Sequence, residues 1–276
     1  MLKWQLPSSK IFLENTFESY MAIINTKVKF MKNESILLKY GFNILIFFWV
    51  LLFNKSLLFA QIAESSDFLN EQQKSIILIS SYTANGDLRK LNGALNKGLN
   101  EGLSINKIKE CLVHSYAYCG FPRSIRGLQT FMQVLEVRRK NGIKDWVGAE
   151  ASHTFDDSSK FERGKTVLEK LTGNPQDGPK AGYATFSPEI EIFLKEHLFA
   201  DLFERDILSY AERELVTISV ISAIGKAEPM LKSHFSICQN LGYSQNQLSH
   251  FVLIIRKPLG IKKSKAAKKV LEDIIN

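Results

Sequence analysis

Three side chains capable of proton transfer recur at every fourth residue near the middle of the chain. Glu110, His114 and Tyr118 are spaced i, i+4 and i+8, so on a helix a carboxylate, an imidazole and a phenol lie in one row. The three groups differ in pKa, and such a row can take, hold and return a proton, as general acid–base catalysis requires. The alternative is a solvated helix face that does no chemistry.

The helix that carries this row is expected to turn its opposite face to the core. One narrow apolar stripe, at about 100° per residue, contains Ile105, Ile108, Leu112, Tyr116 and Cys119. We expect this helix to begin after the N-cap Ser104 and to stop abruptly at Gly120-Phe121-Pro122. That end would place Arg123 beside Tyr118 and Cys119.

Cys119 has two interpretations. On the apolar stripe it is a buried, inert thiol, whereas a positive charge from Arg123 or His114 would make it reactive. The chain has three cysteines, at positions 111, 119 and 238, and no Cys-x-x-Cys pair. On one helix, Cys111 and Cys119 would lie about 12 Å apart along the axis, too far for a disulfide.

A second proton-transfer couple is predicted in the C-terminal half. Ser209 and Glu212 have the spacing of a capping box, so Glu212 either closes a helix N-terminus or takes part in chemistry. His234 lies on the next helix, and a glutamate at the start of one helix can meet a histidine on its antiparallel neighbour. We therefore expect Glu212 and His234 to meet, with Arg213 beside them.

An internal repeat organises the chain. Residues 76–108 align with residues 215–248 at an offset of about 140, and each copy is predicted to be three helices joined by glycine turns. Alternating apolar and polar runs are missing, which indicates an all-α fold of two tandem helical repeats. The counterparts of Glu212 and His234 in the first copy are Gln73 and Ala94, and the Gly-Phe-Pro ending has no counterpart in the second.

The ends of the chain predict export. The expected organisation is a doubtful extension (1–30), a signal peptide (31–60), a first helical domain (66–140), a linker with a short helix (141–186) and a second helical domain (187–276). Lysines 32 and 39, a short apolar run and the small residue Ala60 are typical of a signal peptide. We expect cleavage near Ala60 and a periplasmic or secreted mature chain. The alternative is a membrane anchor formed by residues 41–60.

Two stretches resemble a known family. "GLSINKIKECLVHSYAYCGFPRSIRG" is similar to the signature of the carboxymuconolactone decarboxylase family, in which a glycine turn precedes a helix with Glu, His and a Tyr-x-Gly-Phe-Pro ending. "LSYAERELVTISVISAIGKAEPMLKSHFSICQNLGYS" resembles the other half of the family, and the two copies cover about residues 66–256. The resemblance implies two tandem alkylhydroperoxidase D-like helical repeats and a homo-oligomer, a trimer-like ring of tandem subunits.

The resemblance also implies site residues. Glu212 and His234 match the glutamate and histidine positions of the second half, while the first half is matched by Glu110, His114, Tyr118, Gly120 and Pro122. Some members of the family decarboxylate a lactone acid, and others reduce peroxides with a Cys-x-x-Cys pair that this chain lacks.

Three functions are consistent with these residues. The first is lyase or decarboxylase chemistry on a small organic acid, with Glu212 and His234 as the proton couple and the row from Glu110 to Tyr118 as the second wall. The others are a thiol-dependent peroxidase that uses Cys119 and a non-catalytic helical binding module. The expected substrate contacts are Arg213, Phe121 and Arg123.

No cofactor or metal is expected, because a pair such as Glu110 and His114 supplies too few ligands. The net charge of +8 comes without the aromatic and basic interleaving of a nucleic-acid site, so no nucleic acid is expected as a partner.

Overall fold

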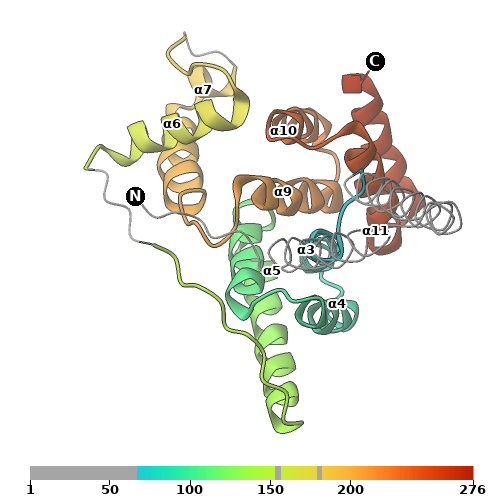
Figure 1. The fold of residues 1–276 in the computed structure, drawn as a ribbon. Coiled ribbons are helices and arrows are strands. Elements are labelled where there is room, and N and C mark those ends of the chain that lie inside the picture. The colour runs from blue at the N-terminus through green and yellow to red at the C-terminus, as the bar shows by residue number, and fades with distance from the viewer. Residues whose placement is uncertain (1–66, 153–156, 179–181, 276) are drawn as a thin grey trace, which may run out of the picture. The chain divides into compact units, whose positions relative to one another are not determined.

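The computed structural model describes residues 67–152, 157–178 and 182–275 (Figure 1). Every regular element in these ranges is a helix, which confirms the predicted all-α fold. None of these helices is long and apolar enough to cross a membrane. The extension and the signal peptide or anchor predicted within residues 1–60 lie outside the described residues.

Three helices form the first half of the bundle. They are α3 (Glu71–Asn85), α4 (Leu88–Asn100) and α5 (Ile105–Lys140). The side chain of Asn70 accepts a hydrogen bond from the Gln73 backbone N–H, and the Gln73 side chain accepts one from the Asn70 backbone N–H, so a capping box starts α3. Gly86, with φ 75°, ends α3, because glycine adopts this left-handed conformation without strain. Ser104 caps α5 as predicted.

Three further helices form the C-terminal half. They are α9 (Tyr210–Ile224), α10 (Glu228–Asn240) and α11 (Gln245–Ile275). The predicted capping box of Ser209 and Glu212 is present at the start of α9. Helices α3 and α9 both have 15 residues, and α4 and α10 both have 13.

Gly120 ends the first helical stretch of α5, as predicted, but a second stretch follows it directly, so that the two meet at a kink. Its φ of 77° and ψ of 161° break the helix at one residue, after which helical backbone continues to Lys140. Pro122 falls in the first turn of the resumed helix, where its missing N–H costs nothing. Gly260 kinks α11 in the same way, with φ 77° and ψ 176°, so the second half does have a counterpart to this feature.

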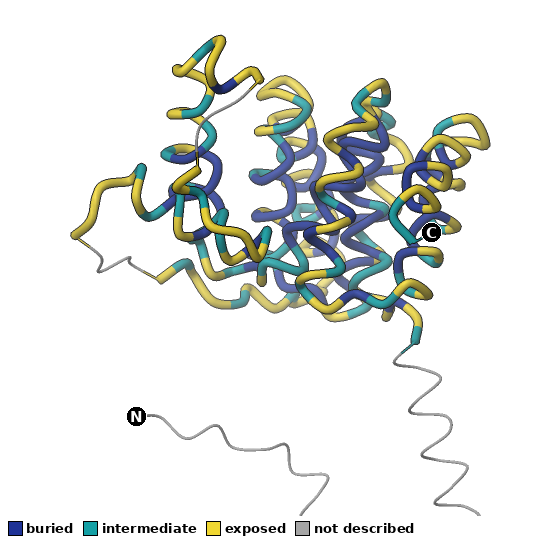
Figure 2. The backbone as a smooth tube through the Cα atoms, turned by 90° about the horizontal axis from the view of Figure 1, so that it is seen from above, coloured by how far each residue is buried: buried dark blue, intermediate teal, exposed yellow. Residues whose placement is uncertain are grey.

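The two halves share one hydrophobic core. Helices α3 and α9 pack against each other and against α5 and α11, and the described residues form one compact unit. Eleven consecutive residues of α9, from Arg213 to Ala223, are buried, so this helix is enclosed on all sides. In Figure 2 the buried segments lie where the helices face one another. Any polar side chain on this part of α9 therefore needs a partner inside the protein.

The segment between the halves packs as a smaller helical unit. It contains α6 (Lys160–Thr172), α7 (Tyr183–Phe186), α8 (Pro188–Phe193) and the π-helix η1 (Leu194–Leu202). A second apolar cluster forms between α6 and η1, with Leu171 and Phe199 among its buried members, and Ile237 of α10 joins it. At Gly164 the backbones of α6 and η1 come so close that a Cβ atom would lie 1.8 Å from the carbonyl oxygen of Lys195.

This close approach predicts that Gly164→Ala destabilises the protein. Backbone atoms of η1 cannot move out of the way as a flexible side chain can, so we expect the free energy of unfolding to fall by about 1–3 kcal/mol. Urea denaturation followed by circular dichroism measures the change. The matched control is Gly93→Ala at an exposed position of α4, where a Cβ meets nothing within 4 Å. There alanine should raise stability by about 0.5–1 kcal/mol. Equal effects at both positions would contradict this packing.

Candidate active site

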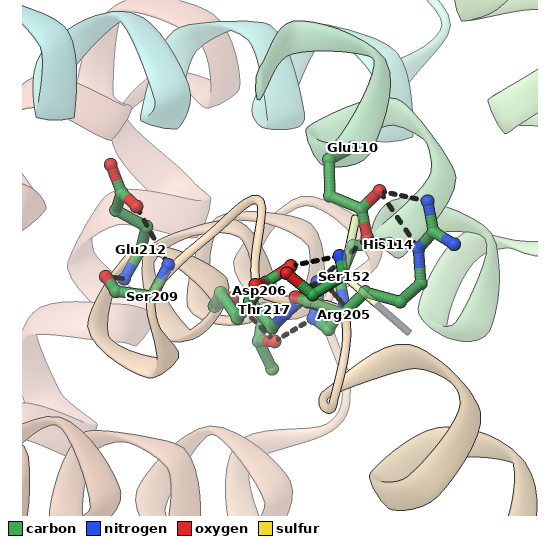
Figure 3. A network of polar contacts seen from close by, with 9 residues as sticks. Glu110, His114, Ser152, Arg205, Asp206, Ser209, Glu212 and Thr217 are labelled. Carbon is green, nitrogen blue, oxygen red and sulfur yellow. Dashed lines mark hydrogen bonds and ion pairs between the residues drawn. The ribbon is translucent and has the colours of Figure 1, made fainter. Parts of the chain in front are cut away.

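A buried polar cluster lies where α5 meets α9. The Glu110 side chain, 2% exposed, accepts a hydrogen bond from Arg213 Nη2 at 2.8 Å. It also forms a two-pronged ion pair with Arg205, whose Nε and Nη2 lie 3.0 Å from the two carboxylate oxygens (Figure 3). Burial lowers the pKa of Arg213 and the Glu110 carboxylate offsets part of this effect, so the guanidinium stays charged. The cluster thus holds a positive charge in the interior of the protein.

His114 is fixed in this cluster as a neutral imidazole. Arg213 Nη1 donates to His114 Nδ1 at 3.2 Å, so the ring proton is on Nε2, which donates to Thr217 Oγ1 at 3.0 Å. The Thr217 hydroxyl in turn donates to the Arg213 carbonyl at 3.0 Å. Burial, together with the nearby Arg213 and His234, holds the pKa of His114 well below its ordinary value. Both ring nitrogens are occupied, so this geometry favours a structural role over proton exchange.

The apolar stripe predicted that the row of Glu110, His114 and Tyr118 faces away from the protein interior. The structure shows that this prediction is wrong. The stripe residues Ile108 and Leu112 do lie in the core, but α9 covers the other face of α5 as well. The periodicity of one helix reveals its most apolar face. It does not reveal that a second helix can cover the polar face and supply charged groups that pair with its side chains.

His234 pairs with Glu214, which corrects the expected pairing with Glu212. The distance from His234 Nδ1 to Glu214 Oε2 is 2.8 Å, and the Glu214 side chain is fully buried. Glu212 accepts the capping hydrogen bond from the Ser209 backbone N–H at 2.9 Å and forms an ion pair with Lys107. Figure 3 places Glu212 and Ser209 apart from His114 and Glu110. Two residues along a helix amount to about 200° of rotation, so Glu212 and Glu214 face opposite ways.

Tyr118 connects the two histidines. Its ring centroid lies 5.5 Å from that of His114 and 5.9 Å from that of His234. Its hydroxyl is buried beside Thr217 without a hydrogen bond of good geometry, and burial together with the Glu214 charge raises the pKa of Tyr118. The phenol thus stays protonated and can donate a hydrogen bond.

Three buried polar atoms around this point lack a hydrogen-bond partner among the described residues. They are the hydroxyl of Tyr118, Oε1 of Glu214 and Nε of Arg213. Because buried polar groups are nearly always hydrogen-bonded, such a group of orphans indicates a place for water or a ligand. The region between α5, α9 and α10 therefore contains both His234, which is paired with Glu214, and hydrogen-bond donors and acceptors that have no partner among the described residues.

Cys119 is held as a thiol. Its Sγ donates to the carbonyl oxygen of Ser115 at 3.1 Å. Burial raises the pKa of Cys119 to about 11, and the nearby charge of Arg123 offsets only part of that. At neutral pH the thiol is protonated and is a poor nucleophile. All three cysteines are free.

The three residues predicted to contact substrate lie in three different settings. Arg213 is buried and occupied by Glu110. The Phe121 ring is 62% exposed and stacks on Tyr116 with 4.5 Å between centroids. The Arg123 guanidinium covers Gly86, where a Cβ would lie 1.5 Å from Nη1. Of the three, Arg213 lies in the polar cluster, whereas Phe121 and Arg123 lie beyond the kink.

Sequence reasoning missed Arg205, Glu214 and Thr217. Glu214 had a signal, because it is the last residue of "ERE" and directly precedes a long apolar run, and a charge buried at the start of such a run must have a partner. Arg205 comes from a loop with no periodicity to reveal it. The described residues contain no group of three or more His, Cys, Asp or Glu side chains that could hold a metal.

The neutral state of His114 predicts that stability depends on pH. Below the ordinary histidine pKa of 6.5, the unfolded chain takes up a proton that folded His114 does not bind. The free energy of unfolding should therefore fall as pH drops from 7 to 5, with at most about 1.4 kcal/mol per pH unit from this residue. Urea titrations across this range measure the slope. His114→Gln should flatten it, whereas the exposed His197→Gln should keep it; an unchanged slope in His114→Gln would exclude this origin.

The comparison with known proteins gives a distant likeness. No family model matches the chain. It is 24% identical to the 4-carboxymuconolactone decarboxylase of Acinetobacter baylyi over 121 residues, which cover 44% of this chain and 90% of that protein. This likeness supports at most a distant relationship to the carboxymuconolactone decarboxylase family. It is consistent with a decarboxylase-like function.

Proposed function

We propose that this chain is a carboxymuconolactone decarboxylase-like enzyme that uses His234, oriented by Glu214, for proton transfer on a small organic acid. The observation that carries the proposal is the 2.8 Å pair between His234 Nδ1 and a fully buried carboxylate. The His234 side chain is 14% exposed, so it lies between the carboxylate and the solvent side. This arrangement suits a proton carrier, whereas a helical module that only binds does not need it.

The Glu214 carboxylate determines which nitrogen of His234 reacts. With Glu214 bound to Nδ1, the free nitrogen Nε2 exchanges the proton with the substrate. In a decarboxylation, the bond between the substrate and its carboxyl carbon breaks and CO₂ leaves. The electron pair stays on the substrate carbon, which takes the proton from Nε2. Solvent then reprotonates the imidazole.

The groups around this pair stabilise the negative charge that develops on the substrate. The protonated Tyr118 hydroxyl is a donor without a partner, and the Arg213 charge lies in a buried setting where water screens it little. Glu110 and His114 hold Arg213 in place. In this proposal Glu110 and His114 are positioning residues, and Glu212 is a helix cap.

The proposal includes a shared origin and a shared site for the two halves. Support comes from the equal lengths of α3 and α9 and of α4 and α10, and from the matching kinks at Gly120 and Gly260. The site takes α5 from the first half and α9 and α10 from the second. Assembly into a ring and export of the mature chain stay predictions.

The test compares two glutamates that are two residues apart. Purified full-length chain is assayed for CO₂ release from 4-carboxymuconolactone and related small organic acids. Glu214→Gln should lower kcat by about 10²-fold or more with KM little changed, because His234 loses its orienting partner. Glu212→Gln should keep kcat within about threefold of wild type, since glutamine also serves in a capping box.

Near-ultraviolet circular dichroism checks that both variants are folded. Equal losses in the two variants, or full activity in Glu214→Gln, would contradict the proposed pair. Ligand binding without turnover in the wild type would favour the non-catalytic binding module.

A second variant separates this chemistry from thiol chemistry. Cys119→Ser keeps a donor for the Ser115 carbonyl, so we expect unchanged decarboxylation. Because the wild-type thiol is protonated, we also expect no thiol-dependent peroxide consumption in either protein, measured with hydrogen peroxide and dithiothreitol. Peroxide turnover that disappears in Cys119→Ser would support the peroxidase alternative instead.

A further inference from the structure

A cavity of about 260 Å³ lies between the end of α9, the start of α10 and the second part of α11. Its walls include the apolar side chains of Ile221, Leu231 and Ala267. Ser222, which also lines it, is eight residues beyond Glu214, or about 12 Å along the axis of α9. The cavity is therefore separate from the His234 and Glu214 pair, and its volume suits a ligand smaller than a typical drug molecule.

Ser222 places an unpartnered hydroxyl in the wall of this cavity. The residue is 4% exposed, and its Oγ has no hydrogen-bond partner among the described residues. Thr83, at the corresponding position of α3, instead donates to the carbonyl of Ile79 at 2.7 Å. A buried hydroxyl without a partner costs free energy, which a bound acceptor or donor would recover.

The start of α10 adds backbone donors to the same cavity. Its N-cap residue is Ala227, which has no side chain to accept the first N–H groups, whereas Asp87 caps α4 by accepting from Lys90 N at 3.1 Å. Pro229 has no N–H, so the free donors of the first turn are the N–H groups of Glu228 and Met230, and such groups at a helix N-terminus attract an anion. Lys226, just before α10, is the one non-glycine residue with positive φ in the described chain, at 57°.

The charges around the cavity favour an anion. Three lysines line it, Lys226, Lys262 and Lys263, against one carboxylate, Glu228. Lys263 donates to the carbonyl of Ala223, while Lys226 and Lys262 have no ion-pair partner in the described part of the chain. The side chains that line the cavity therefore carry a net positive charge beside apolar walls.

The first half of the bundle differs at the corresponding place. Arg123 stands three residues after the kink at Gly120, as Lys263 stands three after Gly260. The guanidinium of Arg123 fills the space over Gly86. The Lys263 side chain only approaches Gly225, with Cε 3.9 Å from where a Cβ would lie.

We propose that this cavity is a second binding site, for a small carboxylate with an apolar body. The carboxylate meets the free N–H groups of α10, the Ser222 hydroxyl and the Lys226 amine, and the apolar body lies against Ile221 and Leu231. The proposal does not depend on the proposed decarboxylase function, because no residue of that site is part of the cavity.

The test is a titration of ¹⁵N-labelled full-length chain, followed by NMR at the amides of Ala227 and Glu228. Three probes separate the requirements: hexanoate has charge and an apolar body, 1-hexanol lacks the charge, and inorganic phosphate lacks the apolar body. We expect saturable shifts with hexanoate and at least about tenfold weaker effects with the other two. Shifts of equal strength with phosphate or hexanol, or none at these amides with hexanoate, would overturn the proposal.

Two variants test where the carboxylate of hexanoate binds. Ser222→Ala and Lys226→Gly should each weaken hexanoate binding about three- to tenfold, since each removes a donor to the anion. Glycine is chosen at position 226 because it keeps the left-handed backbone. Lys265→Gln removes an exposed lysine of α11 outside the cavity and should leave the dissociation constant unchanged. Wild-type affinity in both cavity variants would refute the site, and equal weakening in Lys265→Gln would reduce it to non-specific attraction.

Discussion

The organisation of the site depends on one buried charge, the guanidinium of Arg213. A positive charge with no solvent exposure is strongly destabilising unless a carboxylate and further acceptors surround it. Glu110 supplies the carboxylate from α5, and His114 supplies an acceptor nitrogen one turn further along the same helix. The side chains that would be the most costly to bury alone therefore join the two halves of the bundle and set how α5 and α9 face each other.

The same constraint explains why so many polar groups lie inside a helical core. Once Arg213 is buried, His114 must stay neutral, and its two nitrogens are used by Arg213 and Thr217. The second histidine, His234, has a different environment, since a buried carboxylate rather than a guanidinium is its partner. The histidines of α5 and α10 thus have partners of opposite charge on α9, Arg213 for His114 and Glu214 for His234. Of these two histidines, only His234 keeps a ring nitrogen without a hydrogen-bond partner among the described residues.

Local signals were sufficient to predict the helices but insufficient to pair the side chains. The capping box of Ser209 and Glu212 and the N-cap Ser104 depend on residues close in sequence, and both are present. Choosing between Glu212 and Glu214 as the partner of His234 requires the rotation of α9 relative to α10, which comes from tertiary packing. The helix end at Gly120 was predicted, but the helix that begins directly after it was not, because proline stops one helix and starts the next equally well.

The two halves have corresponding backbone features and different side chains at the places where ligands would bind. Asp87 caps one helix where Ala227 leaves its counterpart uncapped, and Arg123 fills a space that Lys263 does not. At the cavity between α9, α10 and α11, these differences leave an uncapped helix start and a space that the Lys263 side chain does not fill. Replacing an N-cap aspartate by alanine costs about 0.5–2 kcal/mol, and this cost arises at one helix end while the shared core stays unchanged. The proposed second site thus depends on side chains that differ between the two halves, not on the backbone features that they have in common.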